Sequence, residues 1–579
     1  MMTTKSKSTS NNPVPNFYRA SAADFRKIPG SPIAYWVSVM EREIFNESTK
    51  LGNIAPVRQG LATADNDRFL RLWFEVNNNK IGYNISSHEE ANDSRKKWFP
   101  YNKGGDYRKW YGNLEYVVNW ENDGFEIQNF RDENGKLNSR PQNMNYYFKK
   151  SITWSFVSSS FFGVRYSDCN AIFDVGGSSA FPSDEDIFYI TGLLCSKQSF
   201  NFMKIMNPTL NFQVGNVANI PVLNNILEFY KIKINSIVIK IISLSRKDWD
   251  SYETSWDFET LPLLSYEYKS PTIKESYAKL RSHWQEMTDE MQRLEEENNR
   301  IFIEAYGLED ELTPDVPLSE ITLTCNPHYR YGGKRTEEEL EALLLKDTMK
   351  ELISYAVGCM FGRYSLDKPG LVLANQGETI DDYLEQVQKT AFLPDDDNII
   401  PVLDDEYFKD DIVSRFKDFL KVTFGRENLS ANLDFIAKAL SDRSTISPEA
   451  VIRDYFIKQF YKDHLQKYKK RPIYWMFSSG KNQGFNALIY MHRYDKSTLA
   501  KMRTDYLLEL ESKLIAEVEM LSGDQTKNKA RLTKIKNQVE EMQKYDELLN
   551  NKSLQQIEID LDDGVKVNYE KFEGLVRGV

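Results

Sequence analysis

The chain has 579 residues and a formal net charge of −11, with 41% hydrophobic and 27% charged residues. That length allows several domains, since a domain commonly takes about 100–200 residues. The composition is that of a globular protein, and no apolar run approaches the roughly 18 residues that a membrane span needs. The acidic total disfavours nucleic-acid binding by the whole surface. It leaves room for a local basic patch, because charges act over a Debye length of about 10 Å at 0.1 M salt.

The N-terminal segment and the cysteines give two further constraints. Residues 1–15 are polar and rich in Ser, Thr and Asn, without the apolar core of a signal peptide, so we expect a disordered lead-in. The four cysteines, Cys169, Cys195, Cys325 and Cys359, form no C-x-x-C pair. Neither a disulfide framework nor a zinc site is indicated, and a reducing, cytoplasmic location fits this usage.

Residues 57–110 carry the most distinctive pattern in the chain. Between Arg95 and Trp110 six basic residues face one acid, Asp106, and five aromatic residues lie among them. A Gly-rich turn with cations and flat rings can approach a nucleic-acid backbone closely. The pattern therefore indicates a DNA-reading surface. A solvated, aromatic-rich sheet edge is the alternative that the composition leaves open.

In chain order, alternation and turn signals predict a mixed first region. Ser183 stands where the N-cap of a helix is expected. The predicted elements are a helix over 33–45, a strand over 69–76, a strand over 115–120 closed by a turn at 121–124, a strand over 172–175, a helix over 184–206 and a short strand within 212–222.

After residue 223 the pattern becomes mostly helical. An apolar stripe over 280–301 ends at Gly307, and Thr336 with Glu339 forms a capping box for a helix to about 360. The other predicted elements are a helix over 226–247, loop and strand over 311–335, an acidic loop over 393–411, helices within 411–468, two strands within 471–495, an antiparallel helical hairpin over 499–521 and 532–549, and a strand and turn over 557–569.

These elements predict an α+β protein. A mixed α/β region is followed by a mostly helical spacer, a second α/β region and a helical hairpin. The expected boundaries are 1–15 for the lead-in, 16–225 for the first region, 226–310 for the spacer, 311–496 for the second α/β region, and 497–579 for the hairpin with a short C-terminal strand.

Recognisable catalytic motifs are absent. The sequence has no Gly-rich phosphate loop and no G-x-S-x-G elbow, and its five histidines stand alone, so no metal site is expected. One segment, Asn326-Pro327-His328-Tyr329, is close to the Asn-Pro-Pro-aromatic motif with which amino-methyltransferases hold a flipped adenine. His328 replaces the second Pro, and no Gly-rich acidic loop for S-adenosylmethionine precedes it. We interpret the segment as a structural turn.

Several long strings point to a family. They resemble the PglX family of adenine-specific DNA methyltransferases, which belong to BREX phage-defence systems. The resemblance covers nearly the whole chain after Asn16 and corresponds to the C-terminal half of the family. The strings are 28–36, 59–69, 98–105, 116–124, 364–370 and 470–479.

The resemblance implies a target-recognition domain over 16–225 that reads double-stranded DNA. It also implies that the catalytic half, with its S-adenosylmethionine loop and Asn-Pro-Pro-Tyr motif, is missing. No catalytic residue and no cofactor site is therefore expected here, and the chain should not methylate DNA alone. The expected partners are double-stranded DNA, a catalytic methyltransferase half or subunit, and other BREX proteins, without a membrane.

Candidate DNA contacts follow from the division of labour in such domains, where cations position phosphates and side chains read base edges. Gln and Asn pair well with adenine, and Arg with guanine. The candidates for phosphate contact are Arg58, Lys103, Arg108, Lys109, Lys149 and Lys150; those for base reading are Gln59, Asn66, Arg68 and Arg165. For each, an ordinary structural or surface role is the competing interpretation.

Three functional hypotheses remain from the sequence. The first is a DNA-specificity chain that works with a separate catalytic half. The second is an enzyme that methylates DNA through Asn326-Pro327-His328-Tyr329. The third is a protein-interaction subunit that docks through helices 499–549, or a silent recognition cassette without DNA activity of its own.

Overall fold

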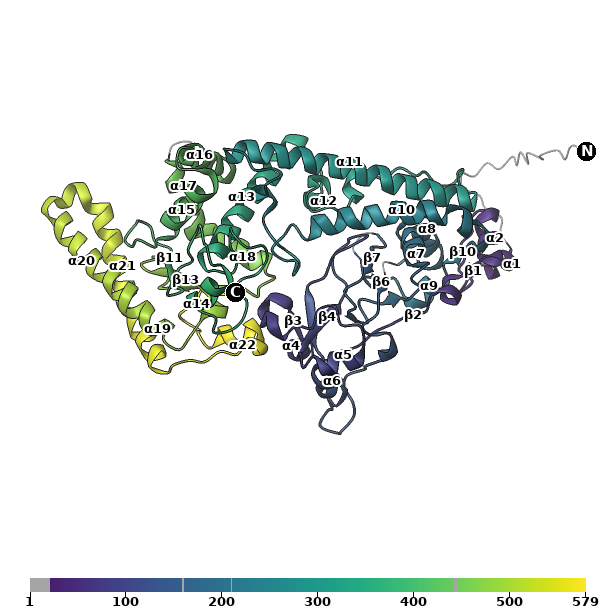
Figure 1. The fold of residues 1–579 in the computed structure, drawn as a ribbon, viewed down its shortest axis with the longest axis horizontal. Coiled ribbons are helices and arrows are strands. Elements are labelled where there is room, and N and C mark those ends of the chain that lie inside the picture. The colour runs from purple at the N-terminus through teal and green to yellow at the C-terminus, as the bar shows by residue number, and fades with distance from the viewer. Residues whose placement is uncertain (1–20, 159–160, 210, 442–445) are drawn as a thin grey trace, which may run out of the picture.

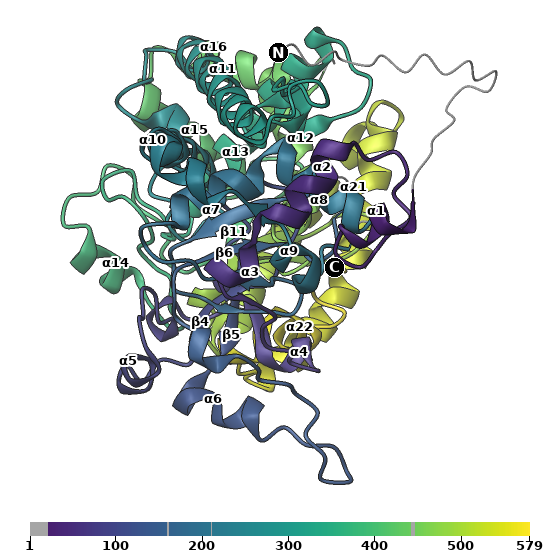
Figure 2. The same ribbon diagram turned by 90° about the vertical axis from the view of Figure 1, so that its right-hand side faces the viewer.

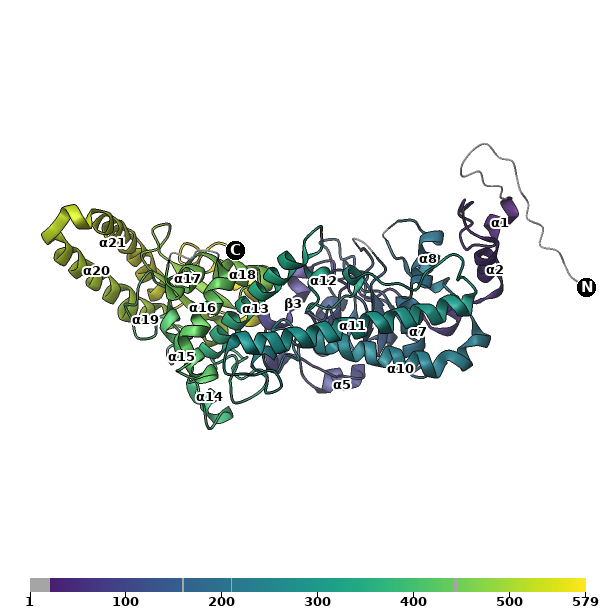
Figure 3. The same ribbon diagram turned by 90° about the horizontal axis from the view of Figure 1, so that it is seen from above.

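The computed structural model describes residues 21–158, 161–209, 211–441 and 446–579. The predicted lead-in, 1–15, lies outside the described residues. Helices take 51% of the chain and strands 10%, which confirms the α+β class. The molecule is elongated, with the first helices at one end and a projecting helical hairpin at the other (Figures 1 and 3).

The N-terminal region, which we define as residues 21–223, combines short helices with short strands. Its helices are α1 Ala22–Arg26, α2 Val39–Glu47, α3 Leu51–Ile54, α4 Asn66–Phe69, α5 His88–Asp93, α6 Glu121–Gln128, α7 Ile187–Cys195, α8 Lys197–Met206 and α9 Val214–Ala218. Its strands are β1 Thr49–Lys50, β2 Val57–Arg58, β3 Leu70–Leu72, β4 Trp98–Asn102, β5 Tyr116–Asn119, β6 Ser151–Trp154, β7 Val164–Ser167, β8 Ile172–Phe173, β9 Ser179–Ala180 and β10 Pro221–Val222.

Two four-stranded sheets form the centre of this region, in the orders β2-β9-β6-β7 and β3-β5-β4-β8. All five residues of β4 are buried, so the apolar part of the basic, aromatic stretch lies in the core of its sheet. Strand β1 pairs antiparallel with β10, with Thr49 opposite Val222. This pairing joins the beginning and the end of the N-terminal region.

Several predicted elements of this region differ from the structure. The helix expected over 184–206 is divided into α7 and α8, because Ser196 is extended and its side chain accepts a hydrogen bond from the Ser199 N–H, capping α8. The strand expected over 69–76 shortens to β3, and Trp73–Glu75 forms a 3₁₀ turn. The turn expected at 121–124 is present as left-handed backbone inside α6, with φ of 52° at Asn122 and 73° at Gly124.

The second half of the chain is mostly helical, as predicted. Its helices are α10 Asn224–Trp249, α11 Ile273–Tyr306, α12 Pro327–Tyr331, α13 Glu337–Met360, α14 Ile380–Gln386, α15 Ile412–Phe424, α16 Leu429–Leu440, α17 Pro448–Tyr455, α18 Tyr461–Lys467, α19 Thr498–Lys501, α20 Leu508–Leu521, α21 Gln525–Leu554 and α22 Gly564–Glu570. Strands β11 Ile400–Pro401, β12 Tyr474–Ser478 and β13 Asn486–Tyr490 form a three-stranded sheet in the order β11-β13-β12.

Helices α10 and α11 lie side by side along the N-terminal region (Figures 1 and 3). The 34-residue α11 is about 51 Å long at the usual rise of 1.5 Å per residue. Thr272 and Glu275 cap its beginning, and Gly307, with φ of 67°, ends it in the left-handed conformation that favours glycine. This pair of helices connects the two ends of the molecule.

The predicted helical hairpin and the Thr336–Glu339 capping box are confirmed. Two predicted strands are wrong. Residues 321–325 form a loop between a 3₁₀ turn and α12, and residues 557–569 form a 3₁₀ turn followed by α22. Figure 2 shows α22 returning to the N-terminal region beside α4, where Lys566 pairs with Asp67 at 2.9 Å. The C-terminus therefore packs against the first region.

None of the helices in the described part of the chain combines the length and the apolar character that a membrane crossing requires. All four cysteines are free thiols, in line with the absence of a predicted disulfide framework.

Candidate nucleic-acid interface

Three of the ten candidate DNA-contact residues, Arg108, Lys109 and Arg165, lie in the interior. Arg108 donates to the Asp248 carboxylate at the end of α10, at 3.2 and 3.3 Å, and also hydrogen-bonds Thr324. Asp248 in turn accepts the N–H groups of Thr324 and Cys325, at 2.7 and 2.9 Å. The Arg108–Asp248 pair thus fastens the N-terminal region to α10 and to the loop before α12.

Lys109 pairs with Glu295 of α11, and the Trp110 indole N–H donates to the same carboxylate at 2.8 Å. The Lys109 and Glu295 side chains are almost fully buried, with 8% and 2% exposed. Burial raises the pKa of Glu295, and the Lys109 charge opposes that effect. Removing one partner of a buried pair leaves an uncompensated charge, so this contact is structural.

Arg165 of β7 is 1% exposed. Its guanidinium donates to the carbonyl oxygens of Arg108 and Gly163, at 3.3 and 3.2 Å, and burial lowers its pKa to about 10. The side chains of Arg108, Lys109 and Arg165, which we call the buried cations, have no access to a DNA surface in this fold. We therefore remove these three residues from the candidate interface.

The structure brings three other candidates together on the surface. Arg58 of β2 and Lys149 both lie over the Tyr146 ring, at 5.2 and 5.4 Å from its centroid, and the Tyr146 and Phe181 rings are 4.7 Å apart. Lys150 follows Lys149 and is exposed. We call Arg58, Lys149 and Lys150, together with these two rings, the basic patch.

A shallow hollow of about 490 Å³ opens beside the basic patch, lined in part by Tyr146, Lys149, Lys150 and Phe181. Among the described carboxylates, none forms an ion pair with Arg58 or Lys149, and Lys150 lies 3.9 Å from the exposed Asp184. Arg58 and Lys149, which have no carboxylate partner among the described residues, and the weakly paired Lys150 are available for phosphates beside the aromatic rings.

Gln59 lies next to the basic patch. Its carbonyl oxygen accepts from Asn143 Nδ2 at 2.8 Å, and the neighbouring Gly60 carbonyl accepts from Gln142 Nε2 at 2.8 Å. These two hydrogen bonds hold the segment before Tyr146 against β2. The patch is thus assembled from segments almost 90 residues apart, and its position is fixed by the backbone.

The remaining three candidates lie elsewhere. Asn66 accepts from Thr63 Oγ1 at 2.6 Å, and Arg68 of α4 donates to Glu126 of α6 at 2.8 Å. Lys103 lies 3.7 Å from Asp174. All three reach solvent in part, but they do not join the basic patch.

A projecting hairpin was missed by the sequence analysis. The loop after α6 extends beyond the rest of the molecule (Figures 1 and 2). It turns through Gly135, with φ of 77°, and Asp132 N–H bonds the Lys136 carbonyl at 2.8 Å. Arg131, Lys136 and Arg140 are exposed on it. The signal in the sequence was the Asp132-Glu133-Asn134-Gly135 turn flanked by cations.

The segment Asn326-Pro327-His328-Tyr329 forms the first turn of α12. Asn326 is fully buried, and its Nδ2 donates to the carbonyls of Leu318 and Ile321, at 2.8 and 2.9 Å. Its Oδ1 accepts the His328 N–H at 3.1 Å. The amide is saturated by local backbone, which agrees with a structural turn and disfavours a base-binding role.

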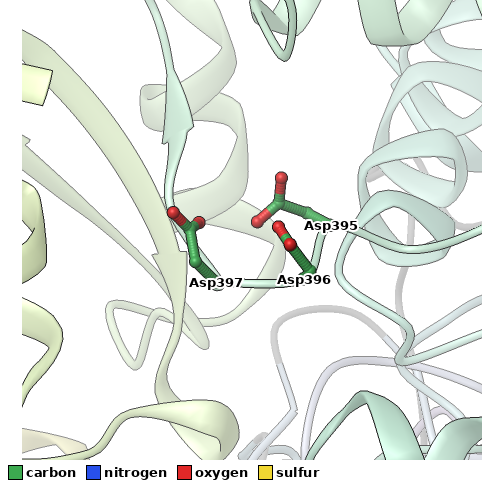
Figure 4. Close-up of side chains that lie close together, drawn as sticks. All are labelled: Asp395, Asp396 and Asp397. Atoms are coloured by element: carbon green, nitrogen blue, oxygen red, sulfur yellow. The ribbon is translucent and has the colours of Figure 1, made fainter. Parts of the chain in front are cut away.

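An acidic group lies in the loop before β11. The side chains of Asp395, Asp396 and Asp397 rise from one side of that loop, with carboxylate oxygens within 4.8 Å of one another (Figure 4). Asp397 accepts from the Tyr506 hydroxyl at 2.8 Å, and both Asp395 and Asp397 accept the Ile399 N–H. Burial and the Asp397 charge raise the pKa of Asp395. These contacts account for the cluster as part of the loop's folding.

Comparison with known proteins identifies relatives over nearly the whole chain. No protein-family model matches it. It is 40% identical over 583 aligned residues to the adenine-specific methyltransferase PglX of Lacticaseibacillus casei (strain Zhang), covering 97% of this chain and 46% of that protein. It is 39% identical over 576 residues to the adenine-specific methyltransferase BrxX of Escherichia coli O9:H4 (strain HS), covering 96% of this chain and 45% of that protein.

The chain is therefore homologous to part of a class of bacterial adenine-specific methyltransferases. Two relatives within that class are PglX and BrxX, and the resemblance in the sequence indicated PglX. The chain spans less than half the length of the curated relatives it matches.

Proposed function

We propose that this chain reads DNA for an adenine-specific methyltransferase of the PglX type, in a BREX phage-defence system. The observation that carries the proposal is the basic patch, with cations and rings held together on the surface. The base of the projecting hairpin lies near β2, because Arg140 pairs with Ala62. Its support from relatives is the identity of about 40% to adenine-specific methyltransferases. Recognition of the adenine target requires contact with DNA, and this patch offers the chemistry for it.

In this proposal the cations of the basic patch bind phosphates, and neighbouring polar groups read base edges. Lys149 and Lys150 supply two positive charges at adjacent positions, and Arg58 supplies a planar guanidinium close to Gln59. The projecting hairpin adds the exposed Arg131, Lys136 and Arg140. Such an arrangement positions the duplex by its backbone and leaves Gln59 and the hairpin to contact the grooves.

Methyl transfer itself falls to a separate catalytic half or subunit in this proposal. That partner would bind S-adenosylmethionine and the flipped adenine, while this chain would recognise the DNA sequence around the target. The work would take place in the bacterial cytoplasm, together with other BREX proteins. Without the partner, the chain is expected to bind DNA and to leave it unmethylated.

The test is the binding of the full chain to duplex DNA, followed by fluorescence anisotropy between 50 and 200 mM salt. Five phosphate contacts, three from the basic patch and two from Lys136 and Arg140 of the projecting hairpin, predict a slope of log K against log salt near −4.5, since each contact contributes about −0.9. Substitution of Lys438 and Lys458 by Gln, two exposed lysines on α16 and after α17, serves as the matched control and should leave the slope unchanged. No binding at 50 mM salt would refute the proposal.

A second candidate function is protein docking through the helical hairpin. Helices α20 and α21 project from the end of the molecule (Figures 1 and 3), and Met520 on α20 is 79% exposed. Met520→Asp should reduce recovery of a partner protein in a pull-down if this end docks, without a change in DNA binding. Equal recovery with both chains would reject docking at this end.

A further inference from the structure

An exposed apolar segment lies at the beginning of α2, at the end of the molecule opposite the helical hairpin (Figures 1 and 3). Residues 33–40 contain five large hydrophobic residues that are each between 49% and 74% exposed. These five are Ile33, Tyr35, Trp36, Val39 and Met40. Elsewhere in the described chain, no eight consecutive positions hold more than two exposed residues of this kind. We call residues 33–40 the apolar segment.

The apolar segment exposes an unusually large area. At about 200 Å² for a fully exposed residue of this size, the five residues present roughly 600 Å². The largest apolar patches on monomeric proteins measure about 300–600 Å². An interface between two domains of one chain buries about 600–1,500 Å² in total, so the segment is large enough to form one side of such an interface.

The apolar segment carries no charge. Although 27% of the chain is charged, residues 33–40 include no Asp, Glu, Lys or Arg. Nearby charges are paired within the chain, because Lys27 pairs with Glu43 and Arg42 lies 3.9 Å from Asp24. DNA, which is bound largely through its phosphates, does not fit an uncharged surface. The occupant that does fit is a protein surface with apolar groups.

Buried neighbours hold the apolar segment in place. Ala34 and Val37 lie between the exposed residues and are themselves buried in the core. Ser38 caps α2 by accepting the Glu41 N–H at 3.1 Å, and Glu41 accepts from Asn201 of α8 at 2.6 Å. A surface that is fixed before binding loses little conformational entropy when a partner binds.

The relatives indicate which protein surface would cover the segment. The chain aligns with 46% of PglX from L. casei and with 45% of BrxX from E. coli, so more than half of each relative has no counterpart here. In such a relative both sides of the contact belong to one chain and are always present together, so the contact can remain apolar. Only β1 and α3 separate α2 from Arg58 of the basic patch along the chain. A part docked on α2 would therefore be attached to the region that is proposed to read DNA.

We propose that the apolar segment is the docking surface for the part of a PglX-type methyltransferase that has no counterpart in this chain. That part presents an uncharged apolar surface that receives the Tyr35 and Trp36 rings, which lie edge to face with centroids 5.2 Å apart. Tyr and Trp often supply much of the binding energy at protein interfaces. The inference rests on the proposed function, because it gives the separate catalytic part of that function its place on this chain.

The test compares one thiol in two proteins, which are the full chain alone and a hybrid in which the chain replaces the matching part of L. casei PglX. Val39→Cys places the thiol at a position that is 69% exposed. Maleimide labelling should be fast in the chain alone and at least about tenfold slower in the hybrid, because a buried thiol is inert. Met520→Cys, at a 79% exposed position on α20, is the matched control and should react equally in both proteins. Proteins without the new thiol give the background from the native cysteines.

Trp36→Asp places a charge in the docking surface. In the hybrid it should speed the labelling of Val39→Cys at least about fivefold, because burying an unpaired charge opposes the contact. In the chain alone it should leave duplex binding unchanged, which anisotropy measures. Loss of duplex binding by the unsubstituted chain would contradict the proposed function, while protection of Val39→Cys in the hybrid would still support docking.

Protection of Val39→Cys in the hybrid, relieved by Trp36→Asp, would support the proposal, and equal labelling in both proteins would overturn it. Slow labelling in the chain alone would also overturn it. Sedimentation would then show whether a second copy covers the segment, as a dimer, or whether residues 1–20 do, as a monomer that reacts quickly once they are deleted. A second hybrid with E. coli BrxX repeats the comparison, so the result does not depend on the folding of one hybrid.

Discussion

The buried cations and the basic patch are built from the same kinds of residue, yet the fold uses them in opposite ways. Lys109 stands in the stretch richest in cations and rings, and it is sealed against Glu295 of α11. Lys149 stands in a similar mixture, and it is exposed over the Tyr146 ring. The difference lies in whether a carboxylate from a distant helix reaches the cation. Local composition alone therefore does not identify a DNA-binding surface.

The largest expected effect comes from breaking a buried pair. Lys109→Met leaves the Glu295 carboxylate buried without its cation, which should lower the free energy of unfolding by about 3–5 kcal/mol. Urea unfolding followed by tryptophan fluorescence measures this loss. Adding Glu295→Gln should recover more than half of it, since the amide oxygen still accepts from Trp110. A loss below about 1 kcal/mol in the single variant would show that Lys109 is not held as described.

A smaller effect, on binding instead of stability, is expected at the basic patch. The triple variant Arg58→Gln, Lys149→Gln, Lys150→Gln should weaken duplex binding about 10- to 100-fold and flatten the salt slope by about 2–3. The free energy of unfolding should change by less than about 1 kcal/mol, because Lys149 and Lys150 are exposed and the half-buried Arg58 forms no ion pair, only hydrogen bonds to the Val57 carbonyl and the Tyr146 hydroxyl. Anisotropy titrations and urea unfolding of one preparation give both quantities. Unchanged affinity would assign DNA binding to another surface.

The projecting hairpin also presents exposed cations. Lys136→Gln with Arg140→Gln removes two exposed cations, so we expect a loss of affinity of about three- to tenfold and a salt slope flatter by about 1–2. The same anisotropy titration measures it. If the slope does not change, the hairpin does not contact phosphates.

The smallest expected effect is at the partly buried carboxyl group of Asp250. Burial raises the pKa of Asp250, near the end of α10, to about 6. Its contribution to stability is therefore present below the ordinary pKa near 4 and is lost as the pH rises through 6. Asp250→Asn should increase the free energy of unfolding by up to about 1 kcal/mol at pH 8, after allowance for partial exposure, and by almost nothing near pH 4. Urea unfolding of Asp250→Asn at both pH values tests the sign of this pH dependence. A gain in the free energy of unfolding at pH 4 alone would contradict the prediction.

Much of the second half of the fold could be predicted from the sequence, because its signals are local. The α11 stripe, the Gly307 ending and the Thr336–Glu339 capping box each depend on residues within one helix. The strand expected before Asn326 was wrong because apolar alternation also suits a buried loop. There the backbone is satisfied partly by side chains such as Asp248.

The candidate site was harder to predict because it depends on contacts between distant segments. The residues around Arg108 in the sequence do not predict its contact with Asp248, which lies 140 positions away. Those around Lys109 do not predict its contact with Glu295. The basic patch was found only in part, since Tyr146 joins Arg58 through the hydrogen bonds of Gln142 and Asn143. Residue type identified the candidates, and tertiary structure separated the buried from the exposed.

The most direct test is lysine acetylation of the full chain with and without duplex DNA, read by mass spectrometry at each lysine. Lys149 and Lys150 should react freely in the absence of DNA and become protected at 50 mM salt, with protection lost at high salt. Lys109 should stay unreactive in both states, because Glu295 and the core enclose it. Equal labelling of Lys149 and Lys150 with and without bound DNA, or rapid labelling of Lys109, would contradict the proposed interface.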